Sequence, residues 1–435
     1  MQLISNIRLV DGPVLWVAWI AGVLAMIFLF RKPGGMRFVR WLVFCLVAVA
    51  FSIGLVVGTH WLLVYVISFF PDEVPVAVLV WIVPPVLALL LWLTAFRHAT
   101  WRARLLKLLP VVLVAALSAV QVNAYFGPNR TVADLTGVAV SEIMALESGM
   151  THQPGKDPVP LTGWKPAGDI PADGGLRTAQ IPGTESGLAT RNAYIYFPPA
   201  YFAANRPALP VLVLMAGQPG GPADWLTGGS LRPRMDSFAA QHGGAAPVVV
   251  VVDSTGSQQG NNLCMDSSIA RADTYLARDV PAWISSTLDV DLDHARWAVG
   301  GFSYGATCAL QMVTRHPEVY ADMIAFSSER EPALAKERQK TVDAAFGGDT
   351  AAFDALVPLT VMSTRTFPGQ AAYFAAGAED PQFVASLNEL VAAAQSAGFS
   401  VRSDVVAGVG HSWDELNVGM PNALAMLSQQ WGWTQ

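Results

Sequence analysis

The segment 301–305, Gly-Phe-Ser-Tyr-Gly, has the residue types and spacing that can turn a serine into a nucleophile. In a G-x-S-x-G pattern a strand turns sharply into a helix, and the serine takes a strained backbone conformation. The glycines are required because a Cβ at either position would collide with neighbouring backbone. A short strand is predicted before the pattern, at 296–299, and a helix rich in small residues after it, at 306–315. The sequence therefore predicts a strand–turn–helix unit that presents Ser303 as a catalytic nucleophile.

A serine nucleophile needs a base, and His411 is the best candidate. It lies in the glycine-rich segment 408–413, after the last predicted strand, 401–406, and before the last predicted helix, 422–431. That position fits the chain order serine, acid, histidine. His316 also lies near the motif, but it follows the predicted helix directly, where capping is its expected role.

The acid that orients the base is expected between the predicted strand 371–376 and the predicted helix 382–397. Asp380 is the first candidate there and Glu379 the alternative. Asp380 also precedes a proline, as a helix N-cap does, so a purely structural role stays open. Asp404 and Asp414 are weaker candidates, because the first falls on a strand and the second lies beyond the histidine.

An oxyanion hole usually takes one backbone N–H from the residue after the nucleophile, here Tyr304. The second comes from the loop after an early buried strand, here 215–221. Gln218 is the expected donor and Gly217 the alternative, since a proline has no N–H to donate.

The first third of the chain is far more apolar than the rest. The 435 residues are 53% hydrophobic and only 14% charged, whereas soluble domains are about a quarter charged. Four apolar runs, each near the roughly 20 residues that cross a bilayer as a helix, occupy residues 14–30, 41–60, 76–96 and 108–126. We expect four transmembrane helices in residues 1–126. The mild net charge of −6 gives no reason to expect a nucleic-acid partner.

Charges in the short loops predict the orientation of these helices. The loop between the second and third runs carries Asp72 and Glu73. The other two loops are basic, with Arg31, Lys32, Arg37 and Arg40 in one and Arg97, Arg102, Arg104 and Lys107 in the other. Basic loops face the cytoplasm, so residues 127–435 are expected on the extracytoplasmic side of the cell membrane.

After the apolar runs we expect a connector, 127–175, with one helix at 138–146 and a stretch rich in proline and glycine. Residues 176–435 then alternate strands and helices. Continuous apolar runs such as 210–216 and 247–253 are typical of buried parallel strands. This pattern predicts an α/β domain with a mostly parallel sheet.

Together these residues resemble the α/β-hydrolase superfamily, and more narrowly the esterase group that includes esterase D, feruloyl esterases and secreted mycolyltransferases. The resemblance covers about Thr178 to Trp433, and its motifs lie at 191–199, 217–220, 301–305, 377–380 and 410–413. It implies that Ser303 is the nucleophile, His411 the general base and Asp380 its orienting acid. Ala216 departs from the group, in which a histidine often precedes the glycine of the oxyanion loop. The membrane runs lie outside the resemblance.

The cysteines and the remaining motifs add three expectations. Cys264 and Cys308 both lie in the outer domain, so we expect a disulfide there that braces the helix after Ser303. The loop 253–268 follows the end of a strand, where α/β folds bind ligands, and it either lines a substrate pocket or is a polar surface loop. No zinc spacing, phosphate loop or dinucleotide motif is present, so the sequence implies no metal and no cofactor.

The predicted function is a membrane-anchored serine esterase that forms an acyl-enzyme on Ser303. Its expected partners are the lipid bilayer and an ester, from a lipid or another cell-envelope component. An acyltransferase with the same triad is the first alternative. An inert binding module on a membrane domain and a channel or transporter with an outer regulatory domain are the others. The sequence leaves the oligomeric state open.

Overall fold

The computed structural model describes residues 7–32, 34–93, 101–153, 155 and 157–433, without the side chains of residues 103 and 104. Arg97, which supports the predicted orientation, lies outside the described residues. The chain divides into two compact units, residues 1–138 with 334–337, and residues 139–333 with 338–435.

The first unit is built from apolar helices. They are α2 (Pro13–Leu29), α3 (Phe38–Trp61), α4 (Val76–Leu93), α5 (Trp101–Phe126) and the short α6 (Val132–Leu135). Helix α5 packs against α2 and α4, while α3 packs against α4. Most of their large apolar side chains point outward and are exposed, as expected for helices that contact lipid.

Three of these helical segments are long and apolar enough to cross a membrane: Phe38–Val66, Val76–Leu93 and Leu105–Phe126. The first predicted span is a helix of only 17 residues, Pro13–Leu29. The second does not end near His60 as expected, because a π-helical turn, Leu62–Val66, continues it.

The second unit contains an eight-stranded sheet in the order β1-β2-β4-β3-β5-β6-β7-β8. Strand β2 is antiparallel to β1 and β4, and all other neighbours are parallel. The strands are β1 (Gly175–Ala179), β2 (Ala193–Phe197), β3 (Val211–Met215), β4 (Val248–Val252), β5 (Trp297–Phe302), β6 (Asp322–Phe326), β7 (Ala371–Gly377) and β8 (Ser400–Val406). The expected mostly parallel α/β sheet is confirmed.

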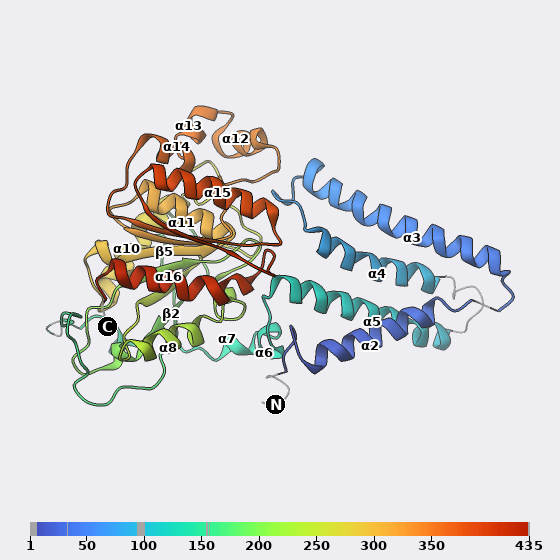
Figure 1. Ribbon diagram of the computed structural model, residues 1–435, viewed down its shortest axis with the longest axis horizontal. Helices are drawn as coiled ribbons and strands as arrows, with labels where there is room; N and C mark the ends of the chain where they lie inside the picture. Colours follow the sequence, from blue (N-terminus) through green and yellow to red (C-terminus); the bar gives the residue numbers. More distant parts are fainter. Residues whose placement is uncertain (1–6, 33, 94–100, 154, 156, 434–435) are drawn as a thin grey trace. The chain divides into compact units, whose positions relative to one another are not determined.

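Helices cover both faces of this sheet (Figure 1). Helices α10, α11, α14 and α15 pack into one apolar core, and α8 and α16 into the other. Buried strands such as β3 supply alternate side chains to the two cores, so they read as continuous apolar runs in the sequence. The helices of this unit are α8 (Leu231–Gln241), α9 (Ala272–Thr274), α10 (Val280–Thr287), α11 (Tyr304–Arg315), α12 (Arg338–Phe346), α13 (Thr350–Asp354), α14 (Pro358–Thr364), α15 (Pro381–Ser396) and α16 (Leu416–Gln430).

Some elements differ from the expectation. The helix expected at 138–146 is a single turn, α7 (Val138–Ser141), and residue 145 instead forms a bridge with Thr178 of β1. The closing helix α16 begins at Leu416, earlier than expected. Helices α12 to α14, between β6 and β7, were not predicted. Helices α12 and α13 have mixed polar sequences that bury few residues, so the apolar pattern that reveals a helix is weak there. Helix α14 buries Val361 and Met362 but has only seven residues, which is too short for a clear helical period.

Candidate active site

Ser303 lies at the turn between β5 and α11 with φ 55° and ψ −121°, a backbone conformation that non-glycine residues rarely take. A Cβ on Gly301 would lie 2.2 Å from the carbonyl carbon of Gly305, and one on Gly305 would lie 2.2 Å from the Met215 oxygen. The Ser303 N–H donates to the Phe326 carbonyl at 2.8 Å. The flanking glycines therefore permit the strained turn, and the neighbouring strand β6 holds it.

His411 meets this serine directly, because its Nε2 lies 2.9 Å from Ser303 Oγ. The imidazole is enclosed by two aromatic rings, with the Phe302 centroid at 5.1 Å and the Phe383 centroid at 4.3 Å. Burial lowers the pKa of His411 to about 4. The ring is therefore neutral at pH 7, and its Nε2 can accept the serine proton.

Asp380 lies on the other side of the imidazole, with Oδ2 3.6 Å from His411 Nδ1. This distance exceeds that of a hydrogen bond. The same carboxylate is the N-cap of α15, where Oδ1 accepts the Phe383 N–H at 3.4 Å. Asp380 can therefore cap the helix and face His411 at the same time, because Oδ1 makes the first contact and Oδ2 the second.

The alternative acids are placed differently. The Glu379 side chain is exposed. Asp404 accepts hydrogen bonds from the Tyr373 hydroxyl at 2.6 Å and from Asn422 at 2.8 Å. Asp414 lies near Asn417, whose amide donates to it at 3.4 Å. Asp380 is thus the predicted acid that the structure places beside His411.

A further carboxyl near this site, Glu415, was not predicted. It is fully buried, and its Oε1 accepts the Ser327 hydroxyl at 2.5 Å. Burial raises the pKa of Glu415 to about 8, and the negative charge of Asp380 contributes to this rise. The hydrogen bond from Ser327 lowers this pKa, but its effect is smaller than that of burial. Among the described residues, Oε2 has no hydrogen-bond partner. A glutamate four residues after the base looks like a surface residue in the sequence, so no signal marked it.

The loop after β3 lies against Ser303. A Cβ on Gly217 would be 3.4 Å from the Ser303 Cβ. The next peptide bond, Gln218–Pro219, is cis. Within the described part of the chain, the backbone N–H groups of Gln218 and Tyr304 donate to no other residue. Both groups are thus free to bind the oxygen of a substrate.

The Tyr304 side chain and a disulfide tie the loop 253–268 to the elbow helix. The Tyr304 hydroxyl donates to Asn262 Oδ1 at 2.8 Å. Cys264 is bonded to Cys308 of α11, with their Cα atoms 5.4 Å apart. The expected disulfide is therefore present in the structure, and the loop is anchored at its middle. In the described residues no cluster of three or more His, Cys, Asp or Glu side chains could hold a metal ion.

Comparison with known proteins gives the family. The model of the family described as "Putative esterase" matches residues 188–425, a range that includes Ser303, Asp380 and His411. The chain belongs to this esterase family. A relative from Corynebacterium glutamicum, itself an uncharacterized protein, is 36% identical over 352 residues, covering 78% of this chain and 79% of the relative.

Two solved structures are similar to the second unit. A ferulic acid esterase has 16% identity and a TM-score of 0.50, covering 59% of this chain and 99% of its own. An S-formylglutathione hydrolase from Agrobacterium tumefaciens has 18% identity and a TM-score of 0.50, covering 61% of this chain and 99% of its own. The fold of the second unit is that of an α/β-hydrolase.

Proposed function

We propose that this esterase-family chain is a membrane-anchored serine esterase with an extracytoplasmic active site. The observation that carries the proposal is the 2.9 Å contact between Ser303 Oγ and His411 Nε2 at a strained elbow. A serine paired with a neutral, buried histidine is an activated nucleophile, whereas a structural serine has no need of a base. Family membership supports the same chemistry.

In the proposed reaction His411 Nε2 takes the hydroxyl proton while Ser303 Oγ bonds to the ester carbonyl carbon. The carbonyl oxygen becomes an oxyanion, which the N–H groups of Gln218 and Tyr304 stabilise. As this intermediate collapses, the ester C–O bond breaks and His411 gives its proton to the leaving alcohol. Water then repeats the two steps on the acyl-enzyme and releases the acid. Asp380 stabilises the imidazolium that forms in each step.

The proposed location rests on three features. Three helices are long and apolar enough to span a membrane. The basic residues of the loop between α2 and α3 favour a cytoplasmic position for that loop. The disulfide between Cys264 and Cys308 is typical of an oxidising compartment. From this location we propose that the substrate is an ester of a lipid or another envelope component, and that an alcohol in place of water would make the same site an acyltransferase.

A fluorophosphonate probe tests whether the site is catalytic. We expect the purified full-length protein in detergent to be labelled, and Ser303→Ala to lose the label completely. Ser286→Ala is the matched control, because Ser286 is an exposed serine on α10, and it should label like the wild type. A folded wild type without labelling would contradict the proposal and favour an inert binding module.

Two further measurements test location and substrate. With Ser286→Cys, a membrane-impermeant maleimide should label intact cells, and labelling only after lysis would contradict the orientation. Mass spectrometry of envelope lipids from cells with the wild type or Ser303→Ala should show one ester class accumulating in the variant. A new ester missing from the variant would instead indicate an acyltransferase.

A further inference from the structure

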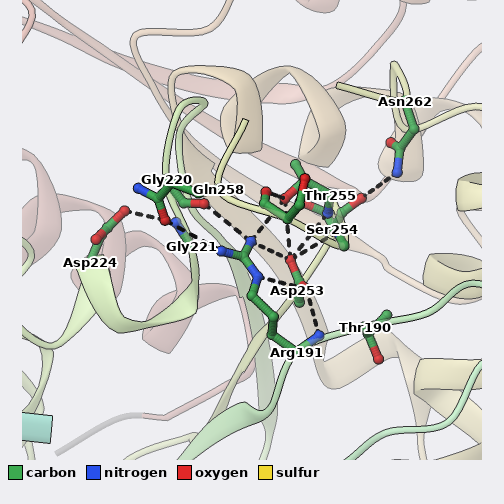
Figure 2. Close-up of polar contacts among 12 residues, drawn as sticks. Thr190, Arg191, Gly220, Gly221, Asp224, Asp253, Ser254, Thr255, Gln258 and Asn262 are labelled. Atoms are coloured by element: carbon green, nitrogen blue, oxygen red, sulfur yellow. Dashed lines mark hydrogen bonds and ion pairs between the residues drawn. The ribbon is translucent and has the colours of Figure 1, made fainter. Parts of the chain in front are cut away.

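Arg191 forms the centre of a polar cluster beside the oxyanion loop (Figure 2). Its Nε and Nη2 donate to the two oxygens of Asp253 at 3.0 and 2.7 Å, and its backbone N–H donates to the same carboxylate at 2.7 Å. The pair is brought together because β2 and β4 are antiparallel neighbours, with Tyr194 opposite Val251. Arg191 precedes β2 and Asp253 follows β4, so the two residues lie side by side where β2 begins and β4 ends.

The ion pair is held rigidly on the Asp253 side. Asp253 is 1% exposed, and it also accepts hydrogen bonds from the backbone N–H groups of Thr255 and Gly256. Burial alone would raise the pKa of this carboxyl, but the hydrogen bonds and charge of Arg191 outweigh burial and lower the pKa. A bidentate ion pair of this kind fixes the position and the orientation of the guanidinium.

The other side of the guanidinium holds the oxyanion loop. Arg191 Nη2 donates to the Gly220 carbonyl at 3.1 Å, two residues after Gln218. The Gly220 N–H donates to the Gln258 carbonyl at 2.9 Å, and the Gln218 side chain donates to the Gln259 carbonyl at 3.2 Å. A Cβ on Gly221 would lie 2.5 Å from Arg191 Nη1, so the loop and the guanidinium are in close contact.

We propose that Arg191, anchored by Asp253, is a positioning residue that fixes the Gly220 carbonyl and thereby the oxyanion-binding N–H of Gln218. This inference rests on the proposed esterase function. It assigns to an arginine far from Ser303 in the sequence a role in holding an oxyanion donor in place before the substrate arrives. Preorganised donors are worth more than mobile ones, because they need no reorganisation during the reaction.

Recognition of an anionic substrate group by Arg191 is the competing interpretation, and the contacts argue against it. Asp253 neutralises the positive charge, and Nε and Nη2 are both engaged. Nη1 has a long contact of 3.5 Å with Gln258 Oε1 and faces the position that a Gly221 side chain would occupy.

The test uses Arg191→Lys in the full-length protein. A lysine keeps the ion pair but cannot hold Asp253 and the Gly220 carbonyl in one planar fork. We expect kcat for a soluble ester to fall about tenfold, less than for complete loss of an oxyanion donor, while KM changes less than about twofold. Affinity for a boronic acid, which forms a tetrahedral adduct on Ser303, should fall by the same factor as kcat. Arg296→Ala, which breaks the partly exposed pair with Asp291, is the matched control and should leave all three constants unchanged.

Gly221→Ala is the second variant, and it is needed if Arg191→Lys fails to fold. Its Cβ displaces the guanidinium while both charges remain, and it should reproduce the loss in kcat and boronate affinity. A folded variant whose kcat is unchanged, or whose kcat falls without any loss of boronate affinity, would overturn the inference. If the wild type itself neither hydrolyses esters nor reacts with fluorophosphonate, the proposed function fails and this inference fails with it.

Discussion

The two sides of the candidate site are built with different rigidity. On the oxyanion side, Arg191, Asp253 and Gly220 are joined by hydrogen bonds of 2.7 to 3.1 Å. On the proton-transfer side, Asp380 Oδ2 lies 3.6 Å from His411 Nδ1. The loop after β3 is thus held by a hydrogen bond from Arg191, whereas Asp380 and His411 are close but not hydrogen-bonded.

This difference is consistent with what each side does in the proposed reaction. An oxyanion donor works best when it does not move, because its target appears only in the transition state. The acid–base contact instead strengthens as positive charge develops on the imidazole, and such contacts are often long in free enzymes. We therefore expect the Asp380–His411 contact to shorten when a transition-state analogue binds.

The largest expected effect comes from removing the base. In His411→Ala the Ser303 hydroxyl loses its proton acceptor, so kcat for ester hydrolysis should fall by about four to six orders of magnitude. The measurement is steady-state hydrolysis of a soluble ester, with the melting temperature as the control for folding. A loss of less than about tenfold would show that another group takes the proton.

Asp380→Asn tests whether the long contact matters. Asparagine keeps the N-cap of α15 but cannot stabilise an imidazolium, so kcat should fall by about two to four orders of magnitude with little change in melting temperature. Glu379→Gln is the matched control, since this neighbouring carboxylate is exposed, and it should behave as the wild type. If Glu379→Gln lost more activity than Asp380→Asn, the assignment of the acid would be wrong.

The disulfide tests the rigidity of the oxyanion side. Replacing both Cys264 and Cys308 by serine opens a link across 44 residues, which the chain-entropy estimate values at about 4 kcal/mol of unfolding free energy. Denaturant unfolding of the purified protein should show a loss of that order or less, with a smaller effect on kcat than in the two variants above. Cys45→Ser, a buried thiol in α3, is the control and should leave the unfolding of the second unit unchanged. An unchanged midpoint of denaturant unfolding in the double variant would show that the disulfide does not stabilise the second unit.

The smallest expected effect is a pH dependence from Glu415. Between its ordinary value near 4.5 and about 8, folded Glu415 keeps a proton that the unfolded chain has released. Stability from this group is therefore present at low pH and is lost as the pH rises through that window. Glu415→Gln has no titrating group at this position and so lacks the effect. The melting temperature of the wild type minus that of the variant should therefore be roughly 5 °C lower at pH 8 than at pH 5.

Asp322 provides the comparison for that measurement. It is a buried carboxyl at the start of β6, and burial raises its pKa to about 7. Asp322→Asn should change the pH dependence of stability in the same direction without changing kcat. If the melting temperatures of Glu415→Gln and the wild type differed by the same amount at every pH, the raised pKa of Glu415 would be contradicted.

Several parts of the site follow from local sequence patterns. The G-x-S-x-G motif between an apolar strand and a helix located Ser303, because the turn depends on glycines two residues away on each side. His411 was located by its place in a glycine-rich loop after the last strand. The strands were predictable because five-residue apolar runs such as Val248–Val252 are buried on both faces.

The choice between acids could not be made from the sequence. Asp380 and Glu379 are adjacent, and both precede a helix. Only the folded chain turns one carboxylate toward His411 and leaves the other exposed. The direction of a side chain at a strand end depends on the loop geometry, which the neighbouring loop of residues 409–410 constrains through close contacts with Gly377.

What the sequence by itself determined is the positions of Ser303 and His411 as site candidates, the α/β class and the apolar helices, since each depends on residues within one turn or one strand. The tertiary structure decided the pairings across long separations. Arg191 meets Asp253 because two antiparallel strands place their ends together, and Glu415 is buried because α16 packs over the end of β6. Such contacts leave no periodic signal, because they depend on strand order and register rather than on neighbouring residues.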